Sequence, residues 1–149
     1  MRAVVQRVSS ARVRVGAEEV AAMGAGLLAL VGVARGDGAE QARALAKKLV
    51  ELRVLPDAEG RMNRCLLDTG GSLGLVSQFT LLGDARKGRR PSYQRAAPAE
   101  EAAPLLEVLA GAVASHGVPV VSGRFRAEME VELVNDGPVT LLLDTEREF

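Results

Sequence analysis

The chain has 149 residues, of which 48% are hydrophobic, and 19 basic side chains balance 19 acidic ones. This length and apolar content predict one domain over residues 1–149, and the zero net charge gives no sign of a polyanion partner. No apolar run reaches the roughly 20 residues of a membrane span, and charges interrupt the start of the chain where a signal peptide would be apolar. We therefore expect a cytoplasmic protein. The single cysteine, Cys65, excludes an internal disulfide and a thiolate zinc site, and no metal or cofactor is expected.

The first half of the chain combines strand-like segments with one helix. Short β-branched or apolar stretches predict strands at residues 2–8, 11–15, 18–23 and 26–34. A helix is expected from about Ala39 to Arg53, with Asp37 as a candidate N-cap. Its apolar residues recur at helical spacing and should pack on the sheet: Ala42, Leu45, Ala46, Leu49 and Leu52.

The second half predicts further strands and a second helix. Residues 70–82 resemble a buried strand entered through a glycine pair, and "VPVVSGRF", "EMEVELV" and "VTLLLD" predict three more strands. A helix is expected near residues 100–115, where Pro104 should lie in the first turn. The whole pattern predicts an α+β fold, with a mainly antiparallel, barrel-like or strongly curved sheet and two packing helices.

The segment "RKGRRPSYQR", residues 86–95, carries five basic side chains and no acid. They are Arg86, Lys87, Arg89, Arg90 and Arg95. Arginine forks suit phosphate oxygens, and the only tyrosine, Tyr93, could stack on a base. The segment is therefore either an RNA contact or a solvated surface loop.

Familiar catalytic groupings are missing from the sequence. The single histidine, His116, stands at a predicted helix C-terminus, where the helix dipole accounts for it, so a Ser-His-Asp or Cys-His nucleophile is disfavoured. "VGVARGDG" lacks the Lys-Ser/Thr ending of a phosphate-binding loop. An enzyme of this sequence must work with backbone groups, hydroxyls and its own substrate.

The hydroxyl-rich candidate is "SQFTL", residues 77–81, in an otherwise apolar stretch. In a strand, Gln78 and Thr80 would lie on one face, and Ser77 and Phe79 on the other. Polar groups in such a stretch need hydrogen-bond partners, but Thr80 can also be an ordinary strand residue.

Near the C-terminus, "NDGP" interrupts a run of strand-forming residues. Asp136-Gly137 is a strong hairpin signal because glycine supplies the positive φ of such turns. Pro138 is not needed for a hairpin, since proline removes a ladder donor. The segment is thus either a rigidified turn or a backbone element shaped for a function.

Four motifs in this order and spacing resemble the D-aminoacyl-tRNA deacylases over roughly residues 1–145: "MRAVVQRV", "GGSLGLVSQFTL", "RKGRRPSY" and "LVNDGPVTLLLD". Leu82 and Gly83 depart from the family pattern, in which a bulkier aromatic and a small residue are expected. The resemblance implies hydrolysis of the ester between a D-amino acid and the terminal adenosine of tRNA, and a homodimer. It also implies a cis Gly137-Pro138 peptide, inserted into the partner's site, that blocks L-amino acids and admits glycine.

The same resemblance assigns Ser77, Gln78, Phe79 and Thr80 to the reaction site. No base is evident to activate Thr80, which favours hydrolysis assisted by the ribose 2′-hydroxyl, with the N–H groups around Phe79 and Thr80 stabilising the oxyanion. Two other readings stay open. One is a non-catalytic RNA-binding module that uses the basic segment, and the other is a metal-independent hydrolase of small esters.

Overall fold

A computed structural model describes all residues, 1–149. In chain order its elements are β1 (Arg2–Val15), β2 (Glu18–Met23), β3 (Gly26–Gly32), α1 (Ala39–Glu51), β4 (Leu55–Pro56), β5 (Met62–Arg64), α2 (Leu66–Thr69), β6 (Ser72–Ser77), η1 (Phe79–Leu82), α3 (Ala99–Ser115), β7 (Val120–Ser122) and β8 (Glu130–Asp144). The short 3₁₀ turn η1 and the helix α2 add to the two helices that the sequence predicted.

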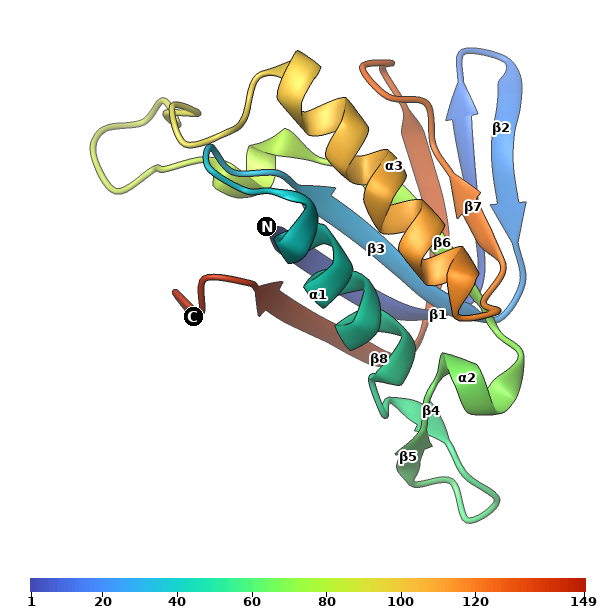
Figure 1. Ribbon diagram of the computed structural model, residues 1–149. Helices are drawn as coiled ribbons and strands as arrows, with labels where there is room; N and C mark the ends of the chain where they lie inside the picture. The colour runs from blue at the N-terminus through green and yellow to red at the C-terminus, as the bar shows by residue number, and fades with distance from the viewer.

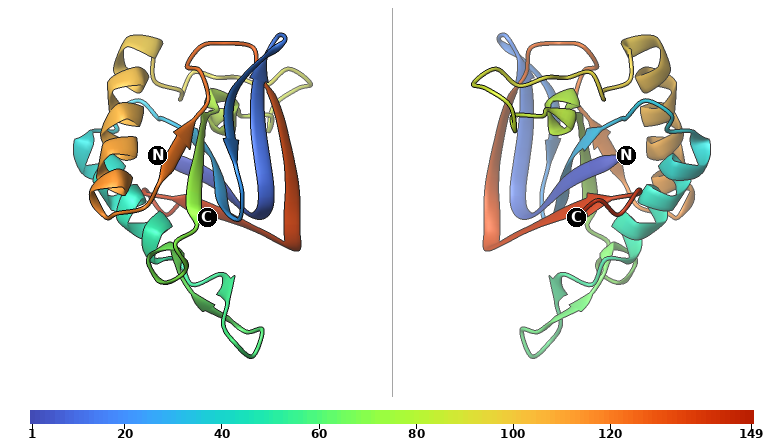
Figure 2. Two further views of the ribbon diagram at one scale, coloured as in Figure 1. Left: turned by 90° about the vertical axis from the view of Figure 1, so that its right-hand side faces the viewer. Right: turned by 90° about the vertical axis from the view of Figure 1, so that its left-hand side faces the viewer.

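Six strands form one curved sheet in the order β2-β1-β3-β6-β7, with β8 also paired to β1. β1 runs antiparallel to β2, β3 and β8, whereas β6 is parallel to β3 and to β7. The sheet curls until β2 approaches β7, which gives a nearly closed, barrel-like shape (Figure 2). The predicted α+β class with a mainly antiparallel, curved sheet is confirmed.

Helices α1 and α3 pack side by side over one face of this sheet (Figure 1). Four residues of the apolar face predicted for α1 are buried: Ala42, Leu45, Ala46 and Leu49. Leu52 is half-buried, and Val50, which was not predicted, is buried as well. α3 buries Ala102, Leu109 and Val113 in the same core. Each fully buried leucine here contributes about 1.5–3 kcal/mol relative to an exposed one, so the helix faces account for much of the packing.

Two strand boundaries were predicted wrongly. Residues 2–8 and 11–15 form one strand, β1, because the chain pairs continuously through Ser9 and Ser10, with bulges in its register to β8. The "NDGP" segment is not a hairpin turn either. It lies inside β8, where both halves of the strand pair with β1 and the register shifts at the bend.

The prediction of one strand over residues 70–82 was also wrong at its end. β6 stops at Ser77 and the chain enters η1, which turns Leu82 back into the core. Gly32 makes room for this turn, since a Cβ there would lie 2.4 Å from Leu82 Cδ2 and 2.8 Å from the Gln78 carbonyl oxygen. The tertiary contact therefore overrides the strand propensity of the sequence.

α1 begins at Ala39 as predicted, but its N-cap and the position of Pro104 in α3 differ from the prediction. Gly38, and not Asp37, is the N-cap of α1, because the Asp37 carboxylate binds the Met1 ammonium and the Ala34 N–H. α3 begins at Ala99, which places Pro104 in the second turn. The proline is exposed, so the carbonyl that loses its helical donor can face water. No helix in the chain has the length and apolar character needed to cross a membrane.

Candidate active site

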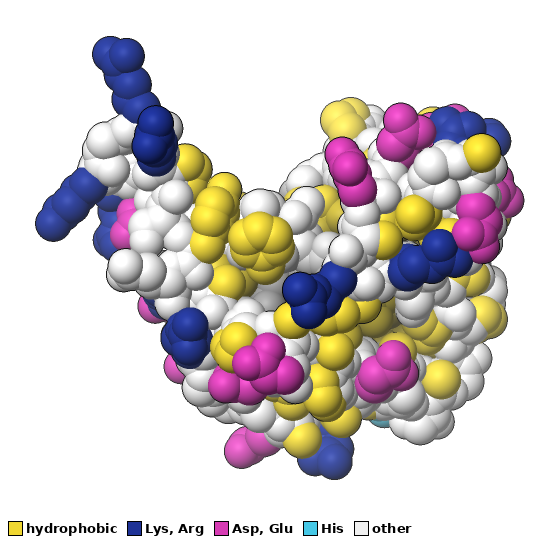
Figure 3. Space-filling view, turned by 90° about the horizontal axis from the view of Figure 1, so that it is seen from above, with side chains coloured by type: hydrophobic (Ala, Val, Ile, Leu, Met, Phe, Trp, Pro, Cys, Tyr) yellow, Lys and Arg dark blue, Asp and Glu magenta, His cyan; other side chains and the backbone are white.

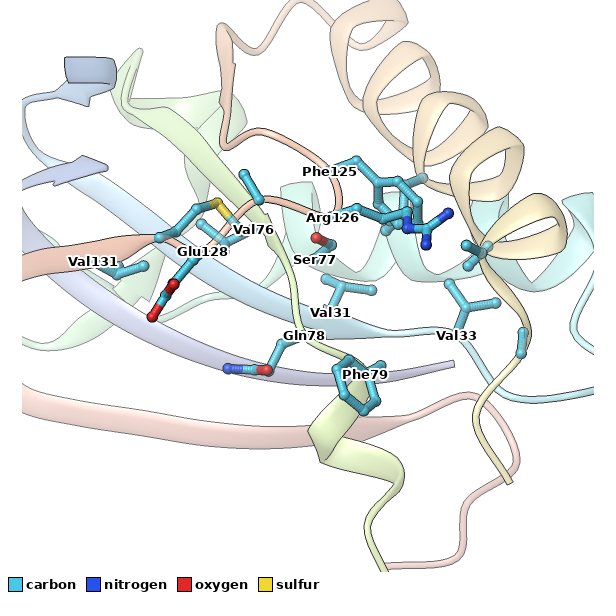
Figure 4. Close-up of a pocket in the computed structure, with 16 residues that line it drawn as sticks. Val31, Val33, Val76, Ser77, Gln78, Phe79, Phe125, Arg126, Glu128 and Val131 are labelled. Atoms are coloured by element: carbon cyan, nitrogen blue, oxygen red, sulfur yellow. The ribbon is translucent and has the colours of Figure 1, made fainter. Parts of the chain in front are cut away.

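The main cavity, about 480 Å³, opens where the end of β6 faces the start of α3 and the segment leading into β8. Its 16 lining residues are mostly apolar, and Val31, Val76, Ala102 and Leu106 form much of the wall. Ser77 and Gln78 supply uncharged polar groups, and Figure 4 shows their side chains among the labelled residues. An apolar cavity with a few convergent polar groups is the usual form of a small-ligand site.

Of the four predicted reaction residues, Ser77, Gln78 and Phe79 line the cavity, and Thr80 follows just outside it. The Thr80 hydroxyl donates to Gln78 Oε1 at 2.7 Å. Because the chain turns at Gln78, these side chains do not alternate between two strand faces as predicted. The first hydrogen bond of the turn runs from the Leu81 N–H to the Gln78 carbonyl. The N–H groups of Phe79 and Thr80 come earlier in the chain, so they have no acceptor within the turn.

Tyr93 is partly exposed and also contacts the rim of the cavity. Its ring packs edge-on against Phe79, with ring centroids 5.1 Å apart and an interplanar angle of 71°. A Cβ at Gly83 would lie 2.9 Å from this ring, which explains the glycine at that position. The aromatic contact joins the base of the basic segment to the rim of the cavity.

The five basic residues of segment 86–95 divide into two groups. Arg86 binds Asp84 through Nε at 2.9 Å, and this hydrogen bond holds the pKa of Asp84 well below its usual range. Arg95 donates to Glu148 at 2.5 Å. Lys87, Arg89 and Arg90 are exposed and form no ion pair. Figure 3 shows Lys and Arg side chains standing out at one side of a hollow that hydrophobic side chains line.

Gly137 and Pro138 are exposed at the bend of β8, and their peptide bond is cis. Arg7 holds this bend through a 2.8 Å hydrogen bond to the Asp136 carbonyl, while Asn135 Oδ1 accepts from the Val139 N–H at 2.9 Å. Neither Gly137 nor Pro138 lines the cavity. Figure 2 shows the bend at the opposite end of the sheet from η1, so one chain does not bring the two predicted parts together.

Sequence reasoning missed one wall of the cavity, which comes from the segment before β8. Phe125, Arg126, Glu128 and Met129 line it there. The predicted strands 118–125 and 128–134 included Phe125, Glu128 and Met129, and Arg126 fell between them. The clustering of an aromatic, two charges and a thioether where these two segments meet was the available signal. His116 ends α3 away from the cavity, and no group of three His, Cys, Asp or Glu side chains gathers where it could hold a metal.

The chain matches known proteins over nearly its whole length. A family model described as "D-Tyr-tRNA(Tyr) deacylase" matches residues 4–144. A D-aminoacyl-tRNA deacylase of Anaeromyxobacter dehalogenans is 58% identical over 149 residues and 100% of both chains. One of Roseiflexus sp. is 59% identical over 145 residues, covering 97% of this chain and 94% of the relative.

Solved structures agree with the fold. A protein titled "c-Myc DNA Unwinding Element Binding Protein" superposes with a TM-score of 0.91 at 34% identity, over 97% of this chain and 99% of the other. A probable eukaryotic D-amino acid tRNA deacylase shares the fold with a TM-score of 0.79 at 18% identity, over 95% and 97% of the two chains. Fold and sequence together define an enzyme of the aminoacyl-tRNA deacylase class. The chain belongs to the D-Tyr-tRNA(Tyr) deacylase family, and the resemblance found in its motifs is confirmed.

Proposed function

We propose that the protein hydrolyses the ester bond of D-aminoacyl-tRNA, releasing the D-amino acid and free tRNA. The observation that carries this proposal is the 58% identity, over the full length of both chains, to a protein named D-aminoacyl-tRNA deacylase. The cavity supports it, because an apolar space of about 480 Å³ edged by Ser77 and Gln78 suits a terminal nucleoside and its ester. Residues 1–149 act as a single domain in this proposal.

Selection against L-aminoacyl esters is assigned to the backbone at Gly137 and Pro138. D and L substrates carry the same atoms, so only geometry can separate them, and a fixed obstacle in the place of an L side chain does so. Arg7 and Asn135 hold the bend by hydrogen bonds, which favours a rigid obstacle. A glycyl ester has hydrogen on both sides and passes the block, so glycyl-tRNA mischarged on tRNA(Ala) is a second substrate.

Hydrolysis depends on the RNA more than on Thr80. The Thr80 hydroxyl donates its proton to an amide oxygen of Gln78, which is no base at neutral pH, so nothing activates this hydroxyl as a nucleophile. In the proposed reaction the ribose 2′-hydroxyl helps to activate water. The N–H groups of Phe79 and Thr80 stabilise the oxyanion, and Ser77 and Gln78 orient the ester. Thr80→Ala should therefore keep most of kcat.

Contact with the tRNA backbone is assigned to the basic segment. Lys87, Arg89 and Arg90 are exposed and unpaired, so their charges are available to phosphates. Arg86 is engaged by Asp84 and Tyr93 by Phe79, and these two residues hold the segment in place beside the cavity.

A homodimer completes the site. Gly137 and Pro138 are exposed and do not line the cavity that contains Ser77 in their own chain, so we assign their obstacle to the cavity of a second copy. The outer face of β8 supports association, because Val134 is 55% exposed and Leu142 is 60% exposed beside the bend. By two-fold symmetry each subunit then gives its bend to the other.

Mixing two complementary variants tests this exchange. A Gly137→Ala/Pro138→Ala chain keeps its cavity but should cleave D and L esters alike, and a Ser77→Ala/Gln78→Ala chain keeps its bend but should be inactive. When the first chain is refolded with an excess of the second, most intact cavities lie in heterodimers, so rejection of the L ester should return if the bend acts across the interface. If the L ester is still cleaved although pull-down through a tag on one chain detects mixed dimers, the bend does not act in the partner.

The first experiment measures cleavage of matched D-, L- and glycyl-tRNA with a chelator present. Cleavage of the D and glycyl esters, with the L ester intact, is the expected result. If tRNA binds and no ester is cleaved, the protein is instead the RNA-binding module that the basic segment also suggests. Turnover of small esters without RNA, unaffected by Arg89→Ala and Arg90→Ala, would favour a general esterase.

A further inference from the structure

Arg126 is the one basic side chain among the residues that line the cavity. Its guanidinium forms no ion pair and no hydrogen bond within the chain, although Arg124, two residues earlier, donates to Glu18 at 2.9 Å. Figure 4 shows the Arg126 guanidinium beside Phe125, whereas the Glu128 carboxylate lies at the other end of the lining residues, on the side of Gln78. A cation without a partner in the chain therefore lies at one end of a mostly apolar cavity.

The backbone at Arg126 is also unusual. Its φ is 61°, in the left-handed region that L residues other than asparagine and aspartate seldom enter. The turn that requires this conformation is closed by a hydrogen bond from the Ala127 N–H to the Arg124 carbonyl. Glycine would occupy the position without strain, so the turn itself gives no reason for an arginine. Non-glycine residues held in such conformations concentrate at functional sites.

We propose that Arg126 binds the phosphate immediately 5′ of the nucleoside whose ester is cleaved. This inference rests on the proposed function. With the terminal nucleoside in the cavity, the nearest anion of the RNA is the phosphate that joins it to the preceding nucleotide, and it must leave through the opening. A guanidinium fork matches phosphate oxygens, and here no carboxylate competes for it.

This role differs from that of the basic segment. Lys87, Arg89 and Arg90 belong to an exposed loop and do not line the cavity, so they suit more distant phosphates. Arg126 lines the cavity itself, so its contact fixes the depth and orientation of the terminal nucleoside. It is a substrate-binding residue and takes no part in proton transfer.

The test compares two substrates that differ only in phosphate. One is D-aminoacyl-tRNA, and the other is the D-aminoacyl ester of free adenosine. Arg126→Asn removes the charge and tolerates the left-handed backbone. It should raise KM for the tRNA substrate about tenfold, the value of one charge-assisted hydrogen bond, and lower the salt dependence of binding. kcat, and all constants for the adenosine ester, should stay at wild-type values.

Two variants serve as controls. Arg126→Lys keeps the charge and should recover most of the tRNA affinity, whereas Arg124→Asn removes a neighbouring arginine that already has a partner and should change nothing. If Arg126→Asn weakens both substrates equally, the residue shapes the cavity and binds no phosphate. Unchanged constants for both substrates would also refute the proposal.

Failure of the proposed function can be told apart from failure of this inference. If the wild-type protein cleaves no D-aminoacyl ester, the deacylase proposal fails. The phosphate contact is then judged by binding of the uncharged trinucleotide CCA and of adenosine. Arg126→Asn should weaken trinucleotide binding about tenfold and leave adenosine binding unchanged, whereas equal trinucleotide binding by both proteins overturns the contact.

Discussion

The Met1 ammonium and the Asp37 carboxylate form a buried ion pair, and breaking it should destabilise the fold strongly. Their side chains are 0% and 3% exposed, and the ammonium lies 2.8 Å from Asp37 Oδ1. Asp37 Oδ2 accepts the Ala34 N–H at 2.6 Å, and Thr145 Oγ1 is a second acceptor for the ammonium. Asp37→Asn would leave a cation in this space without its counter-charge.

The magnitude follows from the burial. Removing one partner of a buried pair costs about 3–5 kcal/mol, because the other charge stays desolvated and unpaired. The Thr145 hydroxyl still accepts from the ammonium, so we expect the lower value, about 3 kcal/mol. For a chain of this size each kcal/mol lowers Tm by about 2–4 °C, which gives a decrease of roughly 6–12 °C.

Thermal and urea unfolding followed by circular dichroism measure the effect. Glu132→Gln is the matched control, because this carboxylate is 54% exposed, pairs with Arg12 and Arg14, and should contribute less than about 1 kcal/mol. If Asp37→Asn lowers Tm by less than about 2 °C, the reasoning is refuted. An N-terminal extension, which converts the ammonium to an amide, should destabilise similarly, whereas one after the exposed Phe149 should not.

Other sites give further expectations. Gly32→Ala puts a methyl group 2.4 Å from Leu82 Cδ2, and urea unfolding should detect a loss of about 1–3 kcal/mol from overpacking, with reduced deacylation. Tyr93→Ala removes an aromatic contact of about 1 kcal/mol, so limited proteolysis of segment 86–95 should accelerate about fivefold. Because Arg86 lowers the pKa of Asp84 below that of the unfolded chain, this ion pair stabilises the segment throughout neutral pH. Proteolytic protection should stay constant from about pH 5 to 8 and fall only below about pH 4, as Asp84 is protonated.

Local patterns predicted the elements whose own residues determine them. The apolar spacing of α1 gave its buried face because helical periodicity places Leu45 and Leu49 on one side whatever packs there. The ends of elements depended on distant groups. Asp37 has the side chain of a good N-cap, but its carboxylate binds the Met1 ammonium, which is 36 residues away in the sequence. Likewise, η1 exists because Gly32 on another strand leaves space for Leu82.

The candidate site divides in the same way. Ser77 and Gln78 could be identified from sequence because polar residues are conspicuous at the end of an apolar strand. Arg126 could not, since only the folded chain reveals that its guanidinium has no partner and lines a cavity. Arg86 and Arg90 look alike in the basic segment, and the difference between them is a carboxylate that only one of them reaches.

The sheet register separates the bend at Gly137 from Ser77 within one chain. Arg7, which holds the bend at Gly137, pairs with Leu27 of β3, and Leu27 pairs with Leu73 of β6. Ser77 lies four residues further along β6, about 13 Å at 3.3 Å per residue, and three strand spacings across the sheet add about 14 Å. A fixed sheet cannot close such a separation by side-chain motion. If the bend selects chirality in the cavity, the subunit that contributes it must be a different one, and dissociating the proposed dimer should abolish discrimination between D and L esters.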